Sequence, residues 1–360
     1  MIPLLKPYLP SFEKYQKYLK VVYDNVWLTN NGPLLKELKG RLEEYLGVKH
    51  LLLTTNGTMA LQIAYKALNL SGNVVSTPYS FIATSASLEW LDLNINFADV
   101  NPLTLNLCAQ NTRQAIDENT TAIVPVHVYG NPCDVKAFDK VAQDHNVKII
   151  YDAAHAFGVK IDGKSILNYG DASILSFHAT KLFHAVEGGG IVFKNEDDYQ
   201  HAVRMINFGI DVPSGEITRP GTNGRMSELH AAMGLAMLDD IDIIMERRMH
   251  HFDLYHRLLG DKVTFPLWHE LTNQNAAYLP VIFDTQQQCS RVFSALEKNK
   301  IQSRRYFSPS LNTLEHLHAG KSVSCPVAER FAKTTLCLPL FVGLSDEDIK
   351  KVCTTLIEAL

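Results

Sequence analysis

The chain lacks the marks of several large protein classes. Its six cysteines show no CxxC spacing, which argues against both a zinc site and a disulfide framework. Its apolar runs, such as the one within 147–153, are far shorter than the roughly 20 residues that span a bilayer. The opening segment MIPLLKPYLP contains three prolines and no signal-peptide pattern. We therefore expect a cytoplasmic protein with no metal site and no membrane partner.

The chain also lacks an excess of positive charge. It has 34 lysines and arginines against 38 aspartates and glutamates, a formal net charge of -4. Such a balance provides no basic surface for a polyanion, so we expect no nucleic-acid partner. No internal repeat and no low-complexity linker divides the 360 residues, of which 46% are apolar. This length and composition favour one large domain and a smaller one.

Seven short runs rich in branched and aromatic residues predict the strands of a sheet. They show little polar alternation, which is typical of strands that are covered on both faces. Helix-compatible stretches lie between several of them, at 58–68, 82–91, 112–116 and 134–145. This alternation predicts an α/β fold with a mainly parallel sheet and right-handed crossovers. The seven runs are 49–55, 73–77, 94–100, 121–128, 147–153, 172–178 and 189–194.

The alternation of short apolar runs and helical stretches ends after Met226. Residues 227–259 read as one long, charge-laced helical stretch that connects to a smaller α+β unit. We accordingly expect a large domain over residues 1–245 and a small C-terminal domain over 246–360.

A single lysine, Lys181, follows an apolar run in the segment SFHATKLFHAVEGGG. Burial beside apolar walls disfavours the charged form of an amine and lowers its pKa toward neutrality. Such an amine can attack a carbonyl group. Glu187 and three consecutive glycines follow, and glycines let a backbone approach a neighbour closely. A surface lysine in a β-connection is the alternative that this segment alone leaves open.

Pyridoxal phosphate is the cofactor that most often uses such a lysine, and it makes three further demands. It needs a carboxylate at its ring nitrogen, an anion site for its phosphate and a flat surface on its ring. Asp152 ends a buried strand in VKIIYDAAHAFG, at a sheet edge where a carboxylate can keep the ring nitrogen protonated. His155 follows within reach of the ring oxygen. The structural alternative is a helix N-cap aspartate beside a satisfied histidine.

Candidates for the phosphate site follow other strands. Asn56, Gly57 and Thr58 precede a helical pattern, where free N–H groups and the helix dipole bind anions. This stretch has neither GxGxxG nor the GK[ST] of a P-loop, so it does not support dinucleotide or ATP binding. Ser176 adds a hydroxyl from the strand end before Lys181. An ordinary turn and helix cap is the alternative for the first three residues.

An aromatic candidate for the ring contact is Phe81, in STPYSFIATSASL. It comes just after a strand, and Pro78 fixes the turn there. An aromatic side chain in that place can stack on a pyridine ring. The alternative is a phenylalanine of the core.

Five motifs occur along the chain in one order: NGTMAL, TPYSFIAT, DAAHAFG, SFHATK with EGGG, and GTNGRMSELHAAMG. On these motifs the chain resembles the DegT/DnrJ/EryC1/StrS sugar-nucleotide aminotransferases, a family of fold-type I pyridoxal phosphate enzymes. The resemblance runs from WLTNNGPL near the start to CLPLFVGLSDEDI near the end. It implies a three-layer large domain like that of aspartate aminotransferase and a small α+β C-terminal domain. It also implies a homodimer with two active sites at the subunit interface.

The resemblance assigns roles to individual residues. Lys181 matches the family's Schiff-base lysine, Asp152 its pyridinium partner and His155 the residue beside the ring. The other cofactor contacts that it implies are the stacking Phe81, then Gly57, Thr58, Met59 and Ser176, and Asn223 of GTNGRM from the neighbouring chain. The residues that it implies for substrate binding are Thr29, Asn31 and Tyr306.

Within the family, WLTNNGPL, VHVYGNPCDV and RRYFSPSL are similar to segments of enzymes that aminate dTDP-linked keto-6-deoxyhexoses. The likeness implies transfer of an amino group from L-glutamate to C4 of dTDP-4-keto-6-deoxyglucose, for surface polysaccharide (O-antigen) biosynthesis. The chain departs from the family at YFSPSLN, where many relatives carry a YxPLH-like segment with a histidine.

Three alternatives stay open beside this prediction. Related enzymes that aminate C3 share much of the pattern. Family members that dehydrate C3 of a keto-hexose have histidine in place of the lysine, so Lys181 argues against that reaction. A non-catalytic sugar-sensing protein on the same fold would have a degraded site, whereas every position here has a chemically competent side chain.

Overall fold

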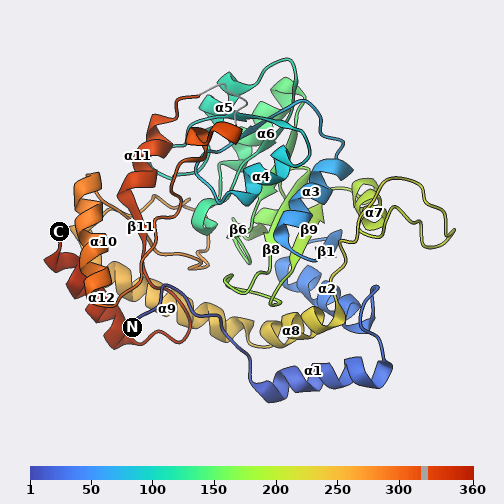
Figure 1. Ribbon diagram of the computed structural model, residues 1–360, viewed down its shortest axis with the longest axis horizontal. Helices are drawn as coiled ribbons and strands as arrows, with labels where there is room; N and C mark the ends of the chain where they lie inside the picture. The colour runs from blue at the N-terminus through green and yellow to red at the C-terminus, as the bar shows by residue number, and fades with distance from the viewer. Residues whose placement is uncertain (318–322) are drawn as a thin grey trace.

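A seven-stranded sheet forms the centre of the computed structural model, which describes residues 1–317 and 323–360 (Figure 1). Its strands lie in the order β1-β9-β8-β5-β4-β2-β3. All seven strands predicted from the sequence are therefore confirmed, and they belong to one sheet. The strands are β1 (Leu51–Thr54), β2 (Asn73–Ser76), β3 (Asn94–Phe97), β4 (Thr120–Val124), β5 (Lys148–Asp152), β8 (Ala172–Ser176) and β9 (Gly189–Phe193).

The sheet is parallel except at β9, which pairs antiparallel with both β1 and β8. Alternate side chains of six of the strands enter two different apolar clusters, whereas β3, at the sheet edge, contributes Ile95 and Phe97 to one cluster alone. In β5, for example, Ile149 and Tyr151 join one cluster and Ile150 joins the other. Both faces are covered, which explains why the strands read as continuous apolar runs.

Helices cover each face and complete a three-layer arrangement. Residues of α2, α6 and α8 share the first cluster with the sheet, and residues of α3, α4 and α7 share the second. The helices of this part are α1 (Phe12–Asn25), α2 (Pro33–Leu46), α3 (Gly57–Ala67), α4 (Ala83–Glu89), α5 (Ala109–Ala115), α6 (Val135–His145), α7 (Glu196–Met205), α8 (Glu228–Leu238) and α9 (Ile241–Leu259). A short hairpin of β6 (Lys160–Ile161) and β7 (Lys164–Ser165) lies outside the sheet.

The single helix expected over 227–259 is wrong, because the chain breaks there into α8 and α9. Asp240 leaves helical geometry, with φ -110° and ψ 7°. Its carboxylate accepts a hydrogen bond from the Tyr8 hydroxyl at 3.0 Å. The neighbouring Asp239 accepts one from Arg41 at 2.8 Å. Residues far away in the sequence stabilise this break. The local sequence around Asp240 has no glycine or proline that would predict it.

A smaller unit follows α9 and has its own apolar cluster, which includes Phe252, Leu296 and Leu356. The N-terminus reaches this unit, since Ile2 pairs with Ile301. Its elements are β10 (Pro280–Ile282), α10 (Gln286–Lys298), α11 (Pro326–Thr334), β11 (Thr335–Cys337) and α12 (Asp346–Glu358). Short 3₁₀ helices of the chain cover Val128–Gly130, Ile166–Asn168, Gly260–Lys262, Leu311–Thr313 and Glu315–Leu317. The domain boundary expected after residue 245 stays a prediction, and α9 runs across it without a break.

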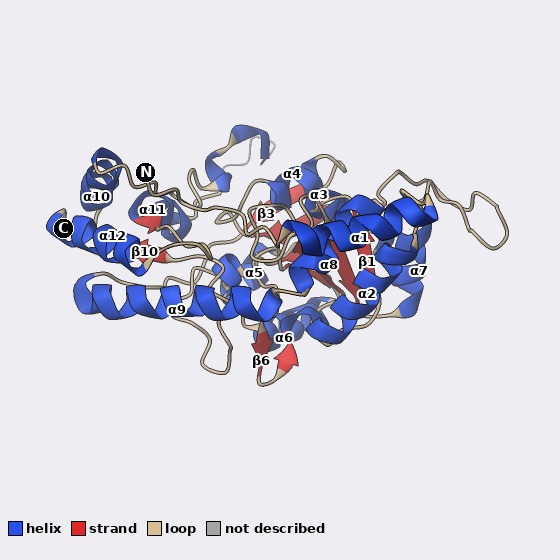
Figure 2. Cartoon of the chain, turned by 90° about the horizontal axis from the view of Figure 1, so that it is seen from below, coloured by secondary structure: helices blue, strands red, loops and turns tan. Residues whose placement is uncertain are grey.

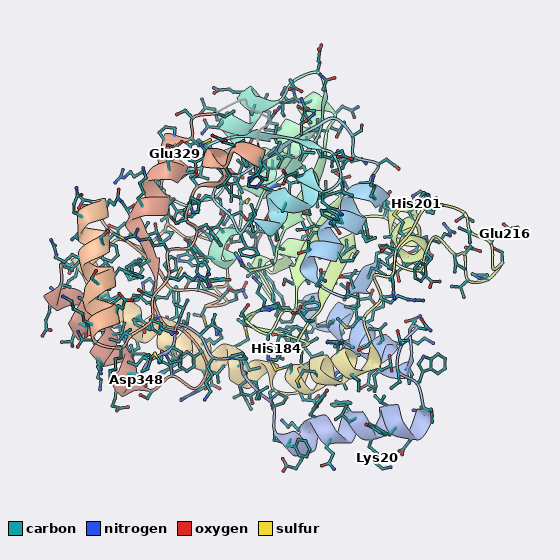
Figure 3. The ribbon with its side chains drawn as sticks, viewed as in Figure 1. Lys20, His184, His201, Glu216, Glu329 and Asp348 are labelled. Atoms are coloured by element: carbon teal, nitrogen blue, oxygen red, sulfur yellow. The ribbon has the colours of Figure 1, made fainter. Side chains whose placement is uncertain are left out.

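A long loop over residues 207–223 projects from the large part, on the side away from the small unit (Figure 2). Its base is held by pairing of Asn207 with Asn223. Figure 3 shows Glu216 at the far end of the loop. Val212 and Ile217 on this loop are 72% and 75% exposed. No helix in the described ranges is long and apolar enough to cross a membrane.

A buried carboxylate links the start of α8 to the start of α2. Glu228, at the start of α8, is only 1% exposed. Its two oxygens accept hydrogen bonds from the backbone N–H groups of Leu34 and Leu35, at 2.8 and 3.1 Å. These N–H groups belong to the first turn of α2 and would otherwise have no partner in that helix. A negative charge there also interacts favourably with the helix dipole.

We expect Glu228→Ala to lower the free energy of unfolding by about 2–4 kcal/mol, because it leaves buried N–H groups without an acceptor. Equilibrium urea unfolding followed by circular dichroism measures the change. Glu37→Ala, which removes an exposed carboxylate from α2 near Arg41, is the matched control and should cost under about 1 kcal/mol. Equal losses in the two variants would contradict the proposed role of Glu228.

Candidate active site

A pocket of about 490 Å³ opens where the strands β1, β2, β5 and β8 end, and the small unit closes one side of it. In open α/β sheets, ligands bind outside the carboxyl ends of the strands. Eight of the residues predicted from the sequence line this pocket: Gly57, Thr58, Phe81, Asp152, His155, Ser176, Lys181 and Tyr306.

Lys181 lies in the loop that joins β8 to β9. The loop is closed at its base because Phe177 N–H donates to the Gly188 carbonyl at 2.8 Å. Phe183 anchors its middle by stacking on Phe157 at 4.6 Å between ring centroids. Burial lowers the pKa of Lys181 to about 8, although the nearby carboxylate of Asp152 acts in the opposite direction. A partly neutral amine is therefore displayed in the pocket near neutral pH.

Asp152 ends β5 on the pocket floor and is 6% exposed. One carboxylate oxygen accepts a hydrogen bond from the Thr84 hydroxyl at 2.7 Å, and the other from Ala154 N–H at 3.1 Å. Burial raises the pKa of Asp152, while these hydrogen bonds and the charge of Lys181 oppose the rise. The alternative of a helix N-cap does not apply, because no helix begins at this residue.

His155 lies beside Asp152 with its ring fixed on both sides. Its Nδ1 accepts the backbone N–H of Tyr129 at 3.3 Å, which leaves the proton of a neutral ring on Nε2. The ring stacks parallel to Phe307 at 5.7 Å. Burial lowers the pKa of His155 well below its usual value, and the charge of Lys181 adds to this. The imidazole is therefore neutral, and its ring lies parallel to the ring of Phe307.

The start of α3 supplies the anion site. The Asn56 side chain caps this helix by accepting Met59 N–H at 2.8 Å. The N–H groups of Gly57 and Thr58 have no hydrogen-bond acceptor among the described residues. A methyl group on Gly57 would come to 3.0 Å from Cβ of Ser176, so the helix start and this hydroxyl lie together. The helix cap that was the alternative for these residues is therefore present. It leaves the N–H groups of Gly57 and Thr58 free to bind an anion.

Phe81 and two tyrosines form the pocket walls. Phe81 is 57% exposed, so the alternative of a core phenylalanine is wrong. Tyr306 comes from the small unit, and its ring lies edge-on to Tyr278 at 5.6 Å. The backbone carbonyl of Tyr306 accepts a hydrogen bond from Tyr79 at 2.9 Å and one from Tyr129. These bonds fix the small unit against the strand ends.

Four predicted residues lie outside the pocket of their own chain. Met59 follows Thr58 on α3, and its side chain lies beside Gly224. Asn223 is exposed at the base of the projecting loop and accepts a hydrogen bond from Arg225 at 3.1 Å. Thr29 and Asn31 are exposed in the connection between α1 and α2. Their expected roles stay predictions.

The glycines after Glu187 serve packing within the protein. A methyl group on Gly189 would come to 2.4 Å from the Asn56 carbonyl oxygen, and one on Gly188 would come to 2.6 Å from Met226. The close approach expected there therefore brings β9 against the start of α3. A second pattern, GVKIDGKS at 158–165, has the letters of a P-loop but folds as the β6–β7 hairpin. Of these two patterns, only the first has a residue in the pocket lining, Glu187, and its glycines are not among the lining residues.

Sequence reasoning missed several residues that shape the site. Thr84 holds the carboxylate of Asp152, but a threonine within a helix carries no signal of that role. Tyr278, Arg304 and Phe307 line the pocket from the small unit. Only folding brings them to the strand ends, since they lie about 90 residues or more beyond the lining residues of the large part. The motif RRYFSPSL contains Arg304 and Arg305, but the sequence gives no reason to expect one of them rather than the other in the pocket.

These groups fit pyridoxal phosphate without modification. The pocket provides a low-pKa amine, a buried carboxylate, a neutral flat imidazole and a helix start with free N–H donors. When bound, the cofactor supplies an electron sink next to the amine of Lys181. The carboxylate of Asp152, the N–H groups of Gly57 and Thr58, and the ring of Phe81 are the residues that would hold it.

The profile of the DegT/DnrJ/EryC1/StrS aminotransferase family matches residues 11–357. The chain belongs to this family. It is 39% identical to a dTDP-4-amino-4,6-dideoxy-D-glucose transaminase of Shigella dysenteriae, over 98% of this chain and 97% of that one. An Escherichia coli protein of the same name is 37% identical, over 99% and 98% of the two chains.

A solved structure of DesI in the presence of its TDP-sugar product superimposes with a TM-score of 0.92 at 34% identity. The match covers 98% of this chain and 91% of that one. The family and fold predicted from the sequence are confirmed, and the chain is a pyridoxal-phosphate-dependent aminotransferase.

We expect the uptake of pyridoxal phosphate by cofactor-free protein to speed up as the pH rises through about 8, because the neutral amine of Lys181 is the reactive form. An unshifted lysine, with a pKa of about 10.4, would place this rise far higher. The growth of visible absorbance after cofactor addition measures the rate.

Two variants control this experiment. Lys181→Ala should abolish the visible band. Lys194→Ala, just beyond the opposite end of β9, should change neither the band nor the rate. A rate that stays flat across about two pH units around 8, or a band that survives in Lys181→Ala, would contradict the assignment.

Proposed function

We propose that the protein moves an amino group from L-glutamate to C4 of dTDP-4-keto-6-deoxyglucose, forming dTDP-4-amino-4,6-dideoxyglucose. The observation that carries the proposal is the likeness, at 39% and 37% identity over nearly the whole chain, to two transaminases named for that product. The solved DesI structure with a TDP-sugar product, at 34% identity, supports a nucleotide-sugar substrate. A role in surface polysaccharide (O-antigen) biosynthesis and a place in the cytoplasm belong to the same proposal.

The residues of the pocket have distinct parts in this reaction. The amine of Lys181, with its pKa lowered to about 8, can accept a proton at one step and return it at the next. The Asp152 carboxylate favours a positive charge beside it, because it accepts two hydrogen bonds that suit its anionic form. The free N–H groups at the start of α3 favour a phosphate.

C3 amination is the second candidate, because the pocket residues described here serve either position. The choice depends on which face of the keto-sugar meets Lys181. A non-catalytic sugar-sensing protein is disfavoured, since the lysine, the carboxylate and the helix start lie in one pocket.

The direct test is to incubate the protein with pyridoxal phosphate, L-glutamate and dTDP-4-keto-6-deoxyglucose. We expect an amino-sugar nucleotide with nitrogen on C4, identified by NMR, together with 2-oxoglutarate. Lys181→Ala should give no product. Nitrogen on C3, or no turnover with this isomer, would contradict the proposed specificity.

We also propose a homodimer in which each chain completes the other's site. The loop over residues 207–223 supports this, because it projects from the body and exposes Phe208, Val212 and Ile217. Asn223 at its base lies outside its own pocket although the family resemblance gives it a cofactor contact. In a symmetric dimer, such a residue can serve the partner's pocket.

Mixing two impaired variants tests the shared site, at a cofactor concentration too low to saturate Asn223→Ala. Asn223→Ala should weaken cofactor binding, and Lys181→Ala should abolish activity. A mixed dimer of the two has one site with both native residues, so refolding them together should restore about a quarter of the wild-type rate. Ser214→Ala, on the same loop, is the control partner and should not weaken cofactor binding. No recovery, or monomers in analytical ultracentrifugation, would contradict the shared site.

A further inference from the structure

Arg304 has a rigid backbone at the edge of the active-site pocket. It pairs with Cys337 at the end of β11, with Arg304 N–H donating at 3.2 Å and Cys337 N–H donating back at 2.8 Å. Its guanidinium lies over the ring of Tyr306, 5.2 Å from the centroid. Stacking of this kind holds an arginine side chain in one place while leaving its N–H donors free.

The adjacent Arg305 has a different environment. Successive side chains of an extended segment point to opposite sides. Arg305 donates a hydrogen bond to the Ser290 hydroxyl at 2.9 Å and lies over Phe293, both on α10. Arg305 does not line the pocket, so the two neighbouring arginines form a natural comparison.

The charge of Arg304 has no acidic partner within 4.0 Å in the part of the chain that the structure describes. Each of the other charged side chains that line the pocket has a titratable side chain near it. Asp152 and Lys181 balance each other across the site, and Glu187 lies 3.6 Å from the ring of His178. Arg304 is therefore a guanidinium at the pocket that has no internal counter-ion.

Arg304 also lines a second cleft, of about 600 Å³, which opens between the N-terminal segment and α10. Thr180, Arg304 and Tyr306 are the residues that this cleft shares with the active-site pocket. Arg304 therefore borders both hollows.

We infer that Arg304 is a substrate-binding residue, which holds an oxyanion of the substrate at the edge of the active-site pocket, where it also borders the second cleft. The inference rests on the proposed function, whose substrates offer two such oxyanions. One is a carboxylate of the amino donor, and the other is the diphosphate of the sugar nucleotide. Arginine suits both, because its planar fork donates two parallel hydrogen bonds to a carboxylate or a phosphate.

Binding measurements on the holoenzyme test this inference and separate the two sources. Glutarate is the probe for the donor carboxylates, and dTDP is the probe for the diphosphate. We expect Arg304→Gln to raise the dissociation constant of one of them at least tenfold by titration calorimetry, because a charge-assisted contact is lost. Arg304→Lys should keep part of the affinity, since the charge remains and the fork does not.

Arg305→Gln is the matched control and should change neither dissociation constant by more than about twofold. Visible absorbance of the bound cofactor should be normal in all three variants, which shows that the site is folded. Unchanged binding of both probes to Arg304→Gln, or no binding of either to the wild type, would overturn the inference. A wild type that binds a probe but does not aminate the keto-sugar would instead contradict only the proposed function.

Discussion

The site depends on placing one amine and one carboxylate together in a pocket that partly excludes water. Burial favours the neutral form of both groups, because it lowers the pKa of Lys181 and raises that of Asp152. Each group offsets part of this effect for the other. The result is an amine with a pKa of about 8 and a carboxylate that hydrogen bonds from Thr84 and Ala154 keep suited to a negative charge.

The architecture brings these two groups together from separate strands. Asp152 ends β5 and Lys181 follows β8, and these strands are parallel neighbours in the sheet. Parallel pairing places both carboxyl ends at the same edge. The aromatic stack of Phe183 on Phe157 then fixes the loop that carries the lysine. The small unit completes the pocket through Tyr306, whose backbone carbonyl is held by hydroxyl groups of the large part.

Much of this could be predicted from local patterns. Most of the seven strands were readable because they are covered on both faces and are therefore rich in apolar residues. Lys181, Asp152 and Gly57 were readable because each lies at the end of such a strand or within a few residues after it. The break between α8 and α9 was not, because Asp240 leaves the helix to meet Tyr8, more than 200 residues away. Thr84 was missed for a related reason, since its importance comes only from the carboxylate that it contacts.

The sequence by itself determined the sheet, the chemical identity of the main site residues and the family, because these depend on side-chain type and local order. Tertiary structure alone decided which residues meet. It placed Met59, Asn223, Thr29 and Asn31 outside the pocket of their own chain and turned Arg304, rather than Arg305, toward the site. These outcomes depend on contacts between distant segments, and the spacing of residues along a chain does not encode such contacts.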